Sequence, residues 1–189
     1  MKRLAEFLYR FHNQKRPLII RIVSLVFGAI TFLLILPACS IFIGRLGKGI
    51  VSFTAPRYLE WIITVPCLAI GLIFLAWATY ALWTIGKGTP LPYAPTQRLI
   101  VSGPYKLCRN PIELGAIFYY TGIGTLYDGM EVGLICALLA LVAGSLYHKL
   151  VEERELEMRF GSKYQDYKER IPFLIPKLRN QDQVKMKVL

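Results

Sequence analysis

Four stretches of apolar residues, at about 18–43, 59–85, 111–127 and 131–150, dominate the pattern along the chain. Runs of about 20 apolar residues are long enough to cross a hydrocarbon layer as helices. The pattern therefore predicts an all-α fold: a polytopic membrane helix bundle with about four transmembrane helices. The first run also resembles a signal peptide faintly, but its long lead-in and Pro37 disfavour cleavage between Ala38 and Cys39.

The third apolar run is short and polar for a membrane span. About 16 residues at ~1.5 Å each reach about 25 Å, which is less than a full hydrocarbon thickness. The run also carries Glu113, Tyr119 and Tyr120, so it needs shelter from lipid. Small residues permit close packing in a hairpin with the fourth run: Gly122 and Gly124 on one side, and Gly133, Ala137, Ala140 and Gly144 on the other.

The fourth run continues as a polar helix to Phe160 and is expected to end at Gly161. We therefore divide the chain into two regions. Residues 1–85 hold a basic amphipathic lead-in (1–17) and the first two spans. Residues 86–189 hold a proline-rich loop, the helical hairpin with its cytosolic extension, an amphipathic C-terminal segment and a basic tail. Residues 97–101 of the loop look extended, and the loop is long enough to cover a site.

Composition and charge place the chain in a membrane. It is 54% hydrophobic and 19% charged, with a formal net charge of +11 and a mean hydropathy of +0.44. The basic residues gather in the lead-in, the 86–110 loop and the C-terminal tail, whereas the 44–58 loop has only Arg45, Lys48 and Arg57. The distribution predicts a multi-pass protein with both termini cytoplasmic. The lipid bilayer explains the positive charge without nucleic acid as a partner.

The cysteines and histidines do not have metal-site spacing. Four cysteines lie far apart, no CxxC pair occurs, and the two histidines are distant in sequence. Free thiols and the absence of a metal site are expected. No GxGxxG or GxxxxGK[ST] sequence occurs, so a Rossmann or phosphate-cradling site has no support.

Two polar clusters, at 110–113 and 148–155, should meet at the cytoplasmic boundary. The topology puts the start of the third helix beside the end of the fourth, which makes a polar pocket between apolar helices. Each cluster also has a structural explanation. Residues 110–113 have the pattern of a capping box at a helix start, and Arg109 could be a residue that snorkels to the membrane surface. The acids at 152–155 could form a solvated helix face. His148 and Glu152 are four residues apart and could be a local pair.

Taken together, these residues fit a zwitterionic nucleotide with an aromatic base. The set offers a cation, two acids, two amides and an aromatic ring: Arg109, Glu113, Glu152, Asn110, Gln97 and Tyr105.

Two ordered motifs resemble the isoprenylcysteine carboxyl methyltransferase and phospholipid methyltransferase family. The first is Gly103-Pro104-Tyr105 with Arg109-Asn110-Pro111 and Gly115. The second runs from Glu152-Glu153 through Phe160-Gly161 to Pro172. The resemblance implies an integral membrane enzyme that uses S-adenosylmethionine near the cytoplasmic face. By resemblance, cofactor contacts fall on Gln97, Leu99, Ile100, Tyr105, Asn110, Pro111, Ile112, Glu113 and Glu152.

The chain departs from the family pattern at three positions. Asn110 replaces a histidine and Glu113 a tyrosine of the first motif, and His148 stands where the family has an arginine that contacts a prenylcysteine substrate. These departures point away from an isoprenylcysteine acceptor.

We therefore expect methyl transfer to an amphiphilic acceptor, with Glu152, Arg109 and His148 as catalytic residues. The acceptor is a phospholipid amine, a lipophilic thiol or an isoprenylcysteine carboxylate, and it is expected to enter laterally between the third and fourth helices. The alternative is a non-enzymatic membrane scaffold or transporter subunit that uses the polar hairpin for packing.

Overall fold

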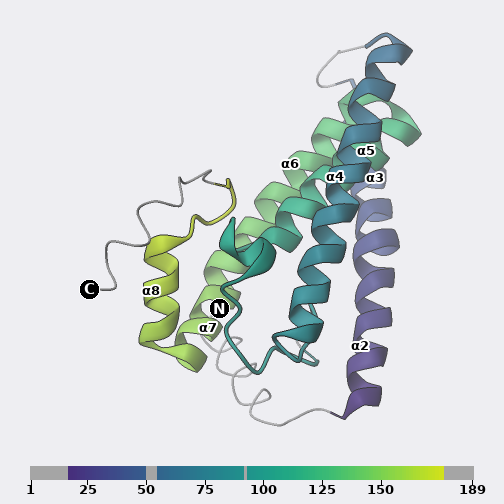
Figure 1. Cartoon of the computed structure of the whole chain (residues 1–189). Coiled ribbons are helices and arrows are strands. Elements are labelled where there is room, and N and C mark those ends of the chain that lie inside the picture. Colours follow the sequence, from purple (N-terminus) through teal and green to yellow (C-terminus); the bar gives the residue numbers. More distant parts are fainter. Residues whose placement is uncertain (1–16, 50–54, 92, 177–189) are drawn as a thin grey trace.

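A computed structural model describes residues 17–49, 55–91 and 93–176. This part of the chain is helical and contains no strand (Figure 1). Its elements are α2 (Leu18–Ile30), the π-helical turn η1 (Thr31–Ile35), α3 (Leu36–Leu46), α4 (Arg57–Thr84), the short 3₁₀ turn η2 (Gly103–Lys106), α5 (Pro111–Asp128), α6 (Met130–Tyr147), the π-helical turn η3 (His148–Glu152), α7 (Glu153–Phe160) and α8 (Ser162–Arg170). The predicted all-α fold is confirmed.

Three continuous helical rods within the described residues are long and apolar enough to cross a membrane. They are Leu18–Leu46, Arg57–Thr84 and Met130–Phe160. The fourth expected span, α5, has 18 residues and lies between α4 and α6, packed against both. The chain is thus a membrane protein with at least three candidate spans, and the predicted count of four stays a prediction.

The first rod stays helical although it contains a proline, Pro37. Pro37 has no N–H to donate to the carbonyl of Leu33, and in the π-helical turn before it the Leu36 N–H donates to the carbonyl of Thr31. Two carbonyls are thereby released, and the hydroxyls of Tyr119 and Tyr120 donate to them, to Leu33 at 3.1 Å and to Phe32 at 3.0 Å. The polar tyrosines of α5 thus satisfy backbone groups of the first rod, as a membrane interior requires.

The α5–α6 hairpin packs backbone against backbone at its glycines. A Cβ atom on Gly124 would lie 3.0 Å from the Cα of Gly133, and one on Gly133 would lie 2.8 Å from the carbonyl oxygen of Thr121. Gly122, however, faces Leu68 of α4. The prediction that small residues permit a close hairpin is therefore right for Gly124 and Gly133 and wrong for Gly122, because α5 turns that face toward α4.

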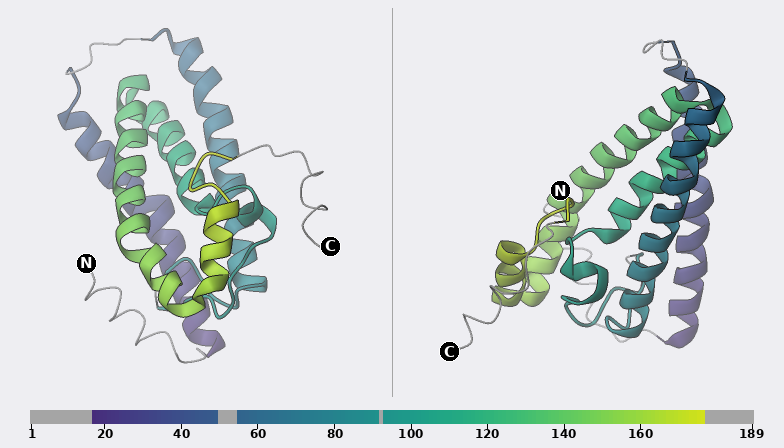
Figure 2. Two further views of the ribbon diagram at one scale, coloured as in Figure 1. Left: turned by 90° about the vertical axis from the view of Figure 1, so that its left-hand side faces the viewer. Right: turned by 45° about the horizontal axis from the view of Figure 1, so that its top comes forward.

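The C-terminal region folds back at the end of the bundle that holds the start of α5. The helix from Met130 ends at Phe160, as expected, and Gly161 adopts a positive φ of 53°. Figure 2 shows α8 returning beside α7. After α8, the backbone N–H groups of Arg109 and Asn110 donate to the carbonyls of Pro172 and Phe173 at 2.9 and 3.2 Å, so this segment braces the start of α5.

The loop before α5 packs on the end of α4. Ile100 is buried against Ala81 and Leu82, and the N–H of Gln97 donates to the carbonyl of Gly86 at 2.6 Å. The extended segment expected at 97–101 is therefore a loop folded onto the bundle. Residues 1–16 of the basic lead-in and the tail (177–189) lie outside the described residues.

Candidate functional site

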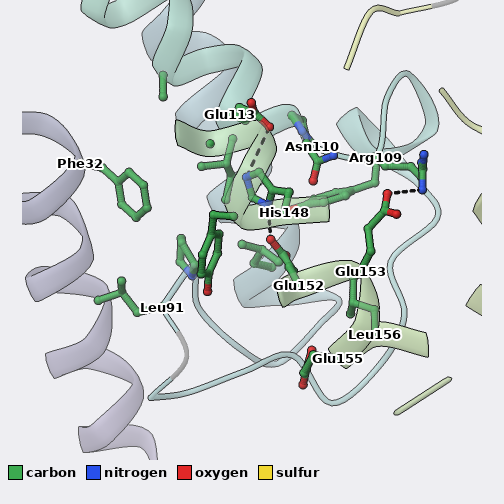
Figure 3. A pocket seen from close by; sticks show the side chains of 18 of the residues that line it. Phe32, Leu91, Arg109, Asn110, Glu113, His148, Glu152, Glu153, Glu155 and Leu156 are labelled. Carbon is green, nitrogen blue, oxygen red and sulfur yellow. Dashed lines mark hydrogen bonds and ion pairs between the residues drawn. The ribbon is translucent and has the colours of Figure 1, made fainter. Parts of the chain in front are cut away.

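A cavity of about 560 Å³ lies between the first rod, α5 and the helix that runs from α6 into α7 (Figure 3). Asn110 and Glu113 from the start of α5 line it together with His148, Glu152 and Glu153 from the end of α6 and beyond. The two polar clusters that the topology predicted to be neighbours therefore share one cavity.

One wall of this cavity is apolar and comes largely from the first rod. Phe32, Leu36 and Ile43 face Leu139 and Ala143 of α6 across it. Leu36 and Ile43 are themselves exposed, so this wall of the cavity is accessible. The predicted entry of the acceptor between the third and fourth helices stays a prediction.

An acid–imidazole–acid array lies at the polar end of the cavity. Nδ1 of His148 contacts the carboxylate of Glu152 closely, and Nε2 lies 3.5 Å from Oε2 of Glu113. The hydroxyl of Ser145 donates to Oε1 of Glu113 at 2.8 Å, whereas Oε2 accepts no hydrogen bond from any described residue. Figure 3 shows the three side chains in a row, with His148 in the middle.

The backbone explains how these side chains meet. His148 opens η3, a π-helical turn inside the long helix, and such turns are frequent at functional sites. Gly144 makes room for Glu113, because a Cβ atom there would lie 2.9 Å from Oε1. The predicted His148–Glu152 pair is confirmed.

A buried ion-pair cluster holds the opposite side of the site. Nη1 of Arg109 lies 2.5 Å from Oε1 of Glu153, with both side chains about one-tenth exposed, and Nζ of Lys168 lies 2.8 Å from Oε2 of the same carboxylate. Glu155 is buried and pairs with Arg159 at 3.0 Å. The expected snorkelling role of Arg109 and the solvated face at 152–155 are therefore wrong for Arg109, Glu153 and Glu155, because these side chains are largely buried and held in ion pairs.

The predicted capping box is also wrong in its side-chain contacts. Asn110 stands at the N-cap position of α5, but neither its side chain nor that of Glu113 caps the helix. Instead, Nδ2 of Asn110 donates to the carbonyl of Phe173 at 3.0 Å. Phe173 also places its ring near the cations of Arg109 and Lys149. Tertiary contacts with the C-terminal segment thus replace the local cap.

Tyr105 is held at the cavity by the same C-terminal region. The hydroxyl of Tyr167 donates to the Tyr105 carbonyl at 2.6 Å. Removal from water, with a smaller effect from Glu152, raises the pKa of Tyr105 well above its ordinary value. Burial likewise raises the pKa of Tyr167. Both phenols therefore stay protonated and neutral at physiological pH.

Most residues expected to contact the cofactor line the cavity, and one does not. The lining positions are Leu99, Ile100, Tyr105, Asn110, Pro111, Ile112, Glu113 and Glu152, whereas Gln97 is exposed and is not a lining residue. Sequence reasoning missed the contribution of the first rod, including Phe32 and Leu36. No local pattern marks these residues, because they are ordinary apolar positions of a membrane span.

The described residues contain no group of histidine, cysteine and acidic side chains that is able to hold a metal ion. The four cysteines are free, with Cys108 and Cys136 buried and Cys39 exposed.

Comparison with known proteins identifies relatives for the part of the chain that forms the site. Residues 59–163 match the family described as phospholipid methyltransferase. The chain is similar to methanethiol S-methyltransferase 2 of Bradyrhizobium diazoefficiens, with 36% identity over 74 residues, 39% of this chain and 27% of that protein. It is also similar to protein-S-isoprenylcysteine O-methyltransferase of Mus musculus, with 36% identity over 84 residues, 43% of this chain and 28% of that protein.

A third relative is the cobalt-zinc-cadmium resistance protein CzcN of Cupriavidus metallidurans, with 32% identity over 82 residues, 42% of this chain and 36% of that protein. The chain thus spans well under half the length of each of these three relatives. No solved structure matches it significantly.

Proposed function

Because this chain belongs to the phospholipid methyltransferase family, we propose that it transfers a methyl group from S-adenosylmethionine to a lipophilic acceptor. The observation that carries the proposal is the cavity between the helical rods. One of its walls is apolar and includes the exposed side chains of Leu36 and Ile43, and its other end holds Glu113, His148 and Glu152. A membrane enzyme with a polar cofactor and a lipophilic acceptor needs both kinds of surface in one place.

The residues at the polar end fit the proposed cofactor. The volume of about 560 Å³ lies within the range of small-molecule sites. The carboxylates of Glu113 and Glu152 suit its cationic groups and hydroxyls, Tyr105 offers a ring beside its base, and Asn110 borders the same space. Oε2 of Glu113 faces Nε2 of His148 at 3.5 Å but accepts no hydrogen bond from any described residue, so it is able to accept one from a ligand.

S-adenosylmethionine supplies an electrophilic methyl carbon next to a positively charged sulfur. The chain's task is then to align the acceptor with that carbon and to exclude water. Ion pairing fixes Arg109 against Glu153, so Arg109 acts by holding α5 and α7 together at the site. The apolar wall of Phe32, Leu36 and Leu139 would hold the acceptor's tail.

The same proposal assigns the cavity to the cytoplasmic side of the membrane. The start of α5, the end of α6 and the C-terminal helices lie at one end of the bundle (Figure 1), where the 86–110 loop and residues 149–170 carry more basic residues than the 44–58 loop at the other end. The positive-inside rule places that end in the cytoplasm, where the cofactor would be available.

Calorimetric titration of the detergent-solubilised protein with S-adenosylmethionine tests the proposal. We expect saturable binding that Glu152→Gln weakens by at least about tenfold, because a charged hydrogen-bonding partner is worth ~1.5–3 kcal/mol. Glu60→Gln, at the opposite end of the bundle, is the matched control and should leave the affinity unchanged. Absence of binding by the unmodified protein would reject the proposal and favour a non-enzymatic scaffold.

A further inference from the structure

We propose that a second cavity, at the end of the bundle opposite to Glu113 and His148, binds the head group of a zwitterionic phospholipid. The start of α4 and the connection from α5 to α6 lie together at that end (Figure 1), and they border a volume of about 490 Å³. This volume is within the range of small-molecule sites. The inference goes beyond the proposed function and does not depend on it, because the lipid held there is not the methyl acceptor.

Two side chains of opposite charge are available to a ligand in this cavity. Arg57 and Glu60 lie three residues apart in the first turn of α4, and both line the cavity. Neither side chain has an ion-pair or hydrogen-bond partner within the part of the chain that the structure describes. The carboxylate of Glu60 lies against the α5–α6 connection, because a Cβ atom on Gly129 would be 3.1 Å from Oε1. The cavity therefore offers one cation and one anion.

The other charged groups that line the cavity are already engaged. Asp128 pairs with Arg45 at 2.5 Å and with Lys48 at 2.8 Å. Oε1 of Glu131 accepts a hydrogen bond from the N–H of Gly49 at 2.6 Å. These groups hold the walls of the cavity together, so a ligand has Arg57 and Glu60 as its charged partners.

A threonine hydroxyl without a partner also lines the cavity. Thr64 is 1% exposed, and its side chain forms no hydrogen bond with a described residue. The hydroxyls of Thr84, Thr121 and Thr125, in contrast, each donate to the carbonyl four residues earlier in their helix. Polar side chains that are almost removed from water are nearly always hydrogen-bonded. The Thr64 hydroxyl therefore needs a partner in the cavity.

Two aromatic rings indicate that the ligand belongs to the membrane. Trp61 of α4 and Tyr127 of α5 line the cavity and are exposed. Such rings attract ammonium groups, and they are enriched where a membrane meets water. Val65, one turn after Trp61, and Leu126 are also exposed, so an alkyl chain is able to continue from the cavity along the helices.

A phosphate joined to an ammonium group matches these partners. The phosphate accepts from Arg57 and from the hydroxyl of Thr64, and the ammonium group pairs with Glu60 beside the aromatic rings. An anionic head group would leave Glu60 without a partner, and a purely cationic ligand would leave Arg57 without one. The chemical class is therefore a zwitterionic head group such as phosphocholine.

The closing experiment compares three probes by native mass spectrometry of the protein in maltoside detergent. The probes are lysophosphatidylcholine, lysophosphatidylglycerol and glycerophosphocholine, and a choline nitrogen has no proton to lose and cannot accept a methyl group. We expect lysophosphatidylcholine to be retained and the other two to bind at least about tenfold more weakly. Equal retention of lysophosphatidylglycerol would overturn the zwitterionic class. Equally tight binding of glycerophosphocholine would overturn the lipid as the occupant.

Variants locate the bound lipid. Arg57→Gln and Glu60→Gln should each weaken retention of lysophosphatidylcholine by about tenfold, whereas Arg57→Lys should keep most of it. Thr64→Val preserves the shape of the side chain and should weaken retention severalfold, and Thr64→Ser should restore it. Lys106→Gln, which removes an exposed cation at the other end of the bundle, is the matched control. Equal retention by all these variants would overturn the site.

The two sites should respond independently to substitution. Glu60→Gln should weaken lysophosphatidylcholine and leave the affinity for S-adenosylmethionine unchanged, and Glu152→Gln should do the reverse. Failure of the unmodified protein to bind S-adenosylmethionine would reject the proposed function and leave the lipid site standing. Failure to retain lysophosphatidylcholine would reject the lipid site alone.

Discussion

Oε2 of Glu113, on α5, lies 3.5 Å from Nε2 of His148, which follows α6. The two residues come from different helices and meet because Gly144 leaves space for the carboxylate and Ser145 donates to its other oxygen. Neither residue is therefore a local helix feature. Their contact makes the site depend on the α5–α6 hairpin.

Gly144→Ala should impair activity without unfolding the protein. The new Cβ would lie 2.9 Å from Oε1 of Glu113, so the carboxylate must move away from Ser145 and His148. Alanine is favoured over glycine in a helix by up to about 1 kcal/mol, so stability should not fall by much. We expect kcat to drop by about tenfold while the melting temperature holds. Gly28→Ala, with 3.4 Å to the nearest atom, is the control and should match the unmodified protein in both measurements.

Breaking the Arg109–Glu153 pair should destabilise the bundle. Both side chains are about one-tenth exposed, and removing one partner of a buried pair costs about 3–5 kcal/mol. We expect Arg109→Met to lower the free energy of unfolding, measured in detergent, by about this amount. The double variant Arg109→Met/Glu153→Met should lose less than the sum of the two single losses.

Arg45→Met provides the comparison for that cycle, because Arg45 pairs with Asp128 but is more than half exposed. The Arg45→Met variant should lose no more than about 1 kcal/mol of unfolding free energy. Equal losses at the two pairs would show that the Arg109 pair is not shielded from solvent.

Cys108 should resist alkylation up to strongly alkaline pH. Burial raises the pKa of its thiol from the ordinary 9.0 to about 11, and the thiolate is the reactive form. Cys39 is exposed and should react first with a membrane-permeant maleimide, as mass spectrometry would show. Because the folded pKa is raised, the stability contribution is complete below pH 9 and is lost as the pH rises through about 11. Rapid labelling of Cys108 in the folded protein at neutral pH would contradict this burial.

Labelling of intact cells tests the proposed orientation. In a background without Cys39 and Cys67, Tyr127→Cys should react with an impermeant maleimide from outside. Ser162→Cys should react only after the membrane is opened, because the C-terminal helices are assigned to the cytoplasm. Both positions are exposed, so access to the reagent decides the result. The reverse pattern would move the site to the other face of the membrane.

The helices and the meeting of the two polar clusters could be predicted from sequence because they follow from local signals. The lengths of the apolar runs predict where the long helices lie. Pro111 marks the start of α5 and Gly161 the end of α7, and the tight connection after Asp128 makes α5 and α6 neighbours. These features depend on residues close together in the chain.

The remaining features could not be predicted because they depend on distant partners. The Asn110 side chain donates to the carbonyl of Phe173 instead of capping α5. Glu153 is buried by contacts with Arg109 and Lys168. The π-helical turns at Thr31 and His148 have no signature in composition. Tyr119 and Tyr120 looked unusually polar for a span, but only the carbonyls freed before Pro37 explain them.

The exposure of Leu36 and Ile43, which also line the cavity, has a kinetic consequence for the proposed methyl transfer. An acceptor's alkyl tail is able to remain among the acyl chains while its head reaches Glu152. Turnover would then follow the mole fraction of acceptor in the bilayer, not its bulk molarity. Diluting the vesicles with buffer would leave the rate per enzyme constant, and diluting them with inert lipid would slow it.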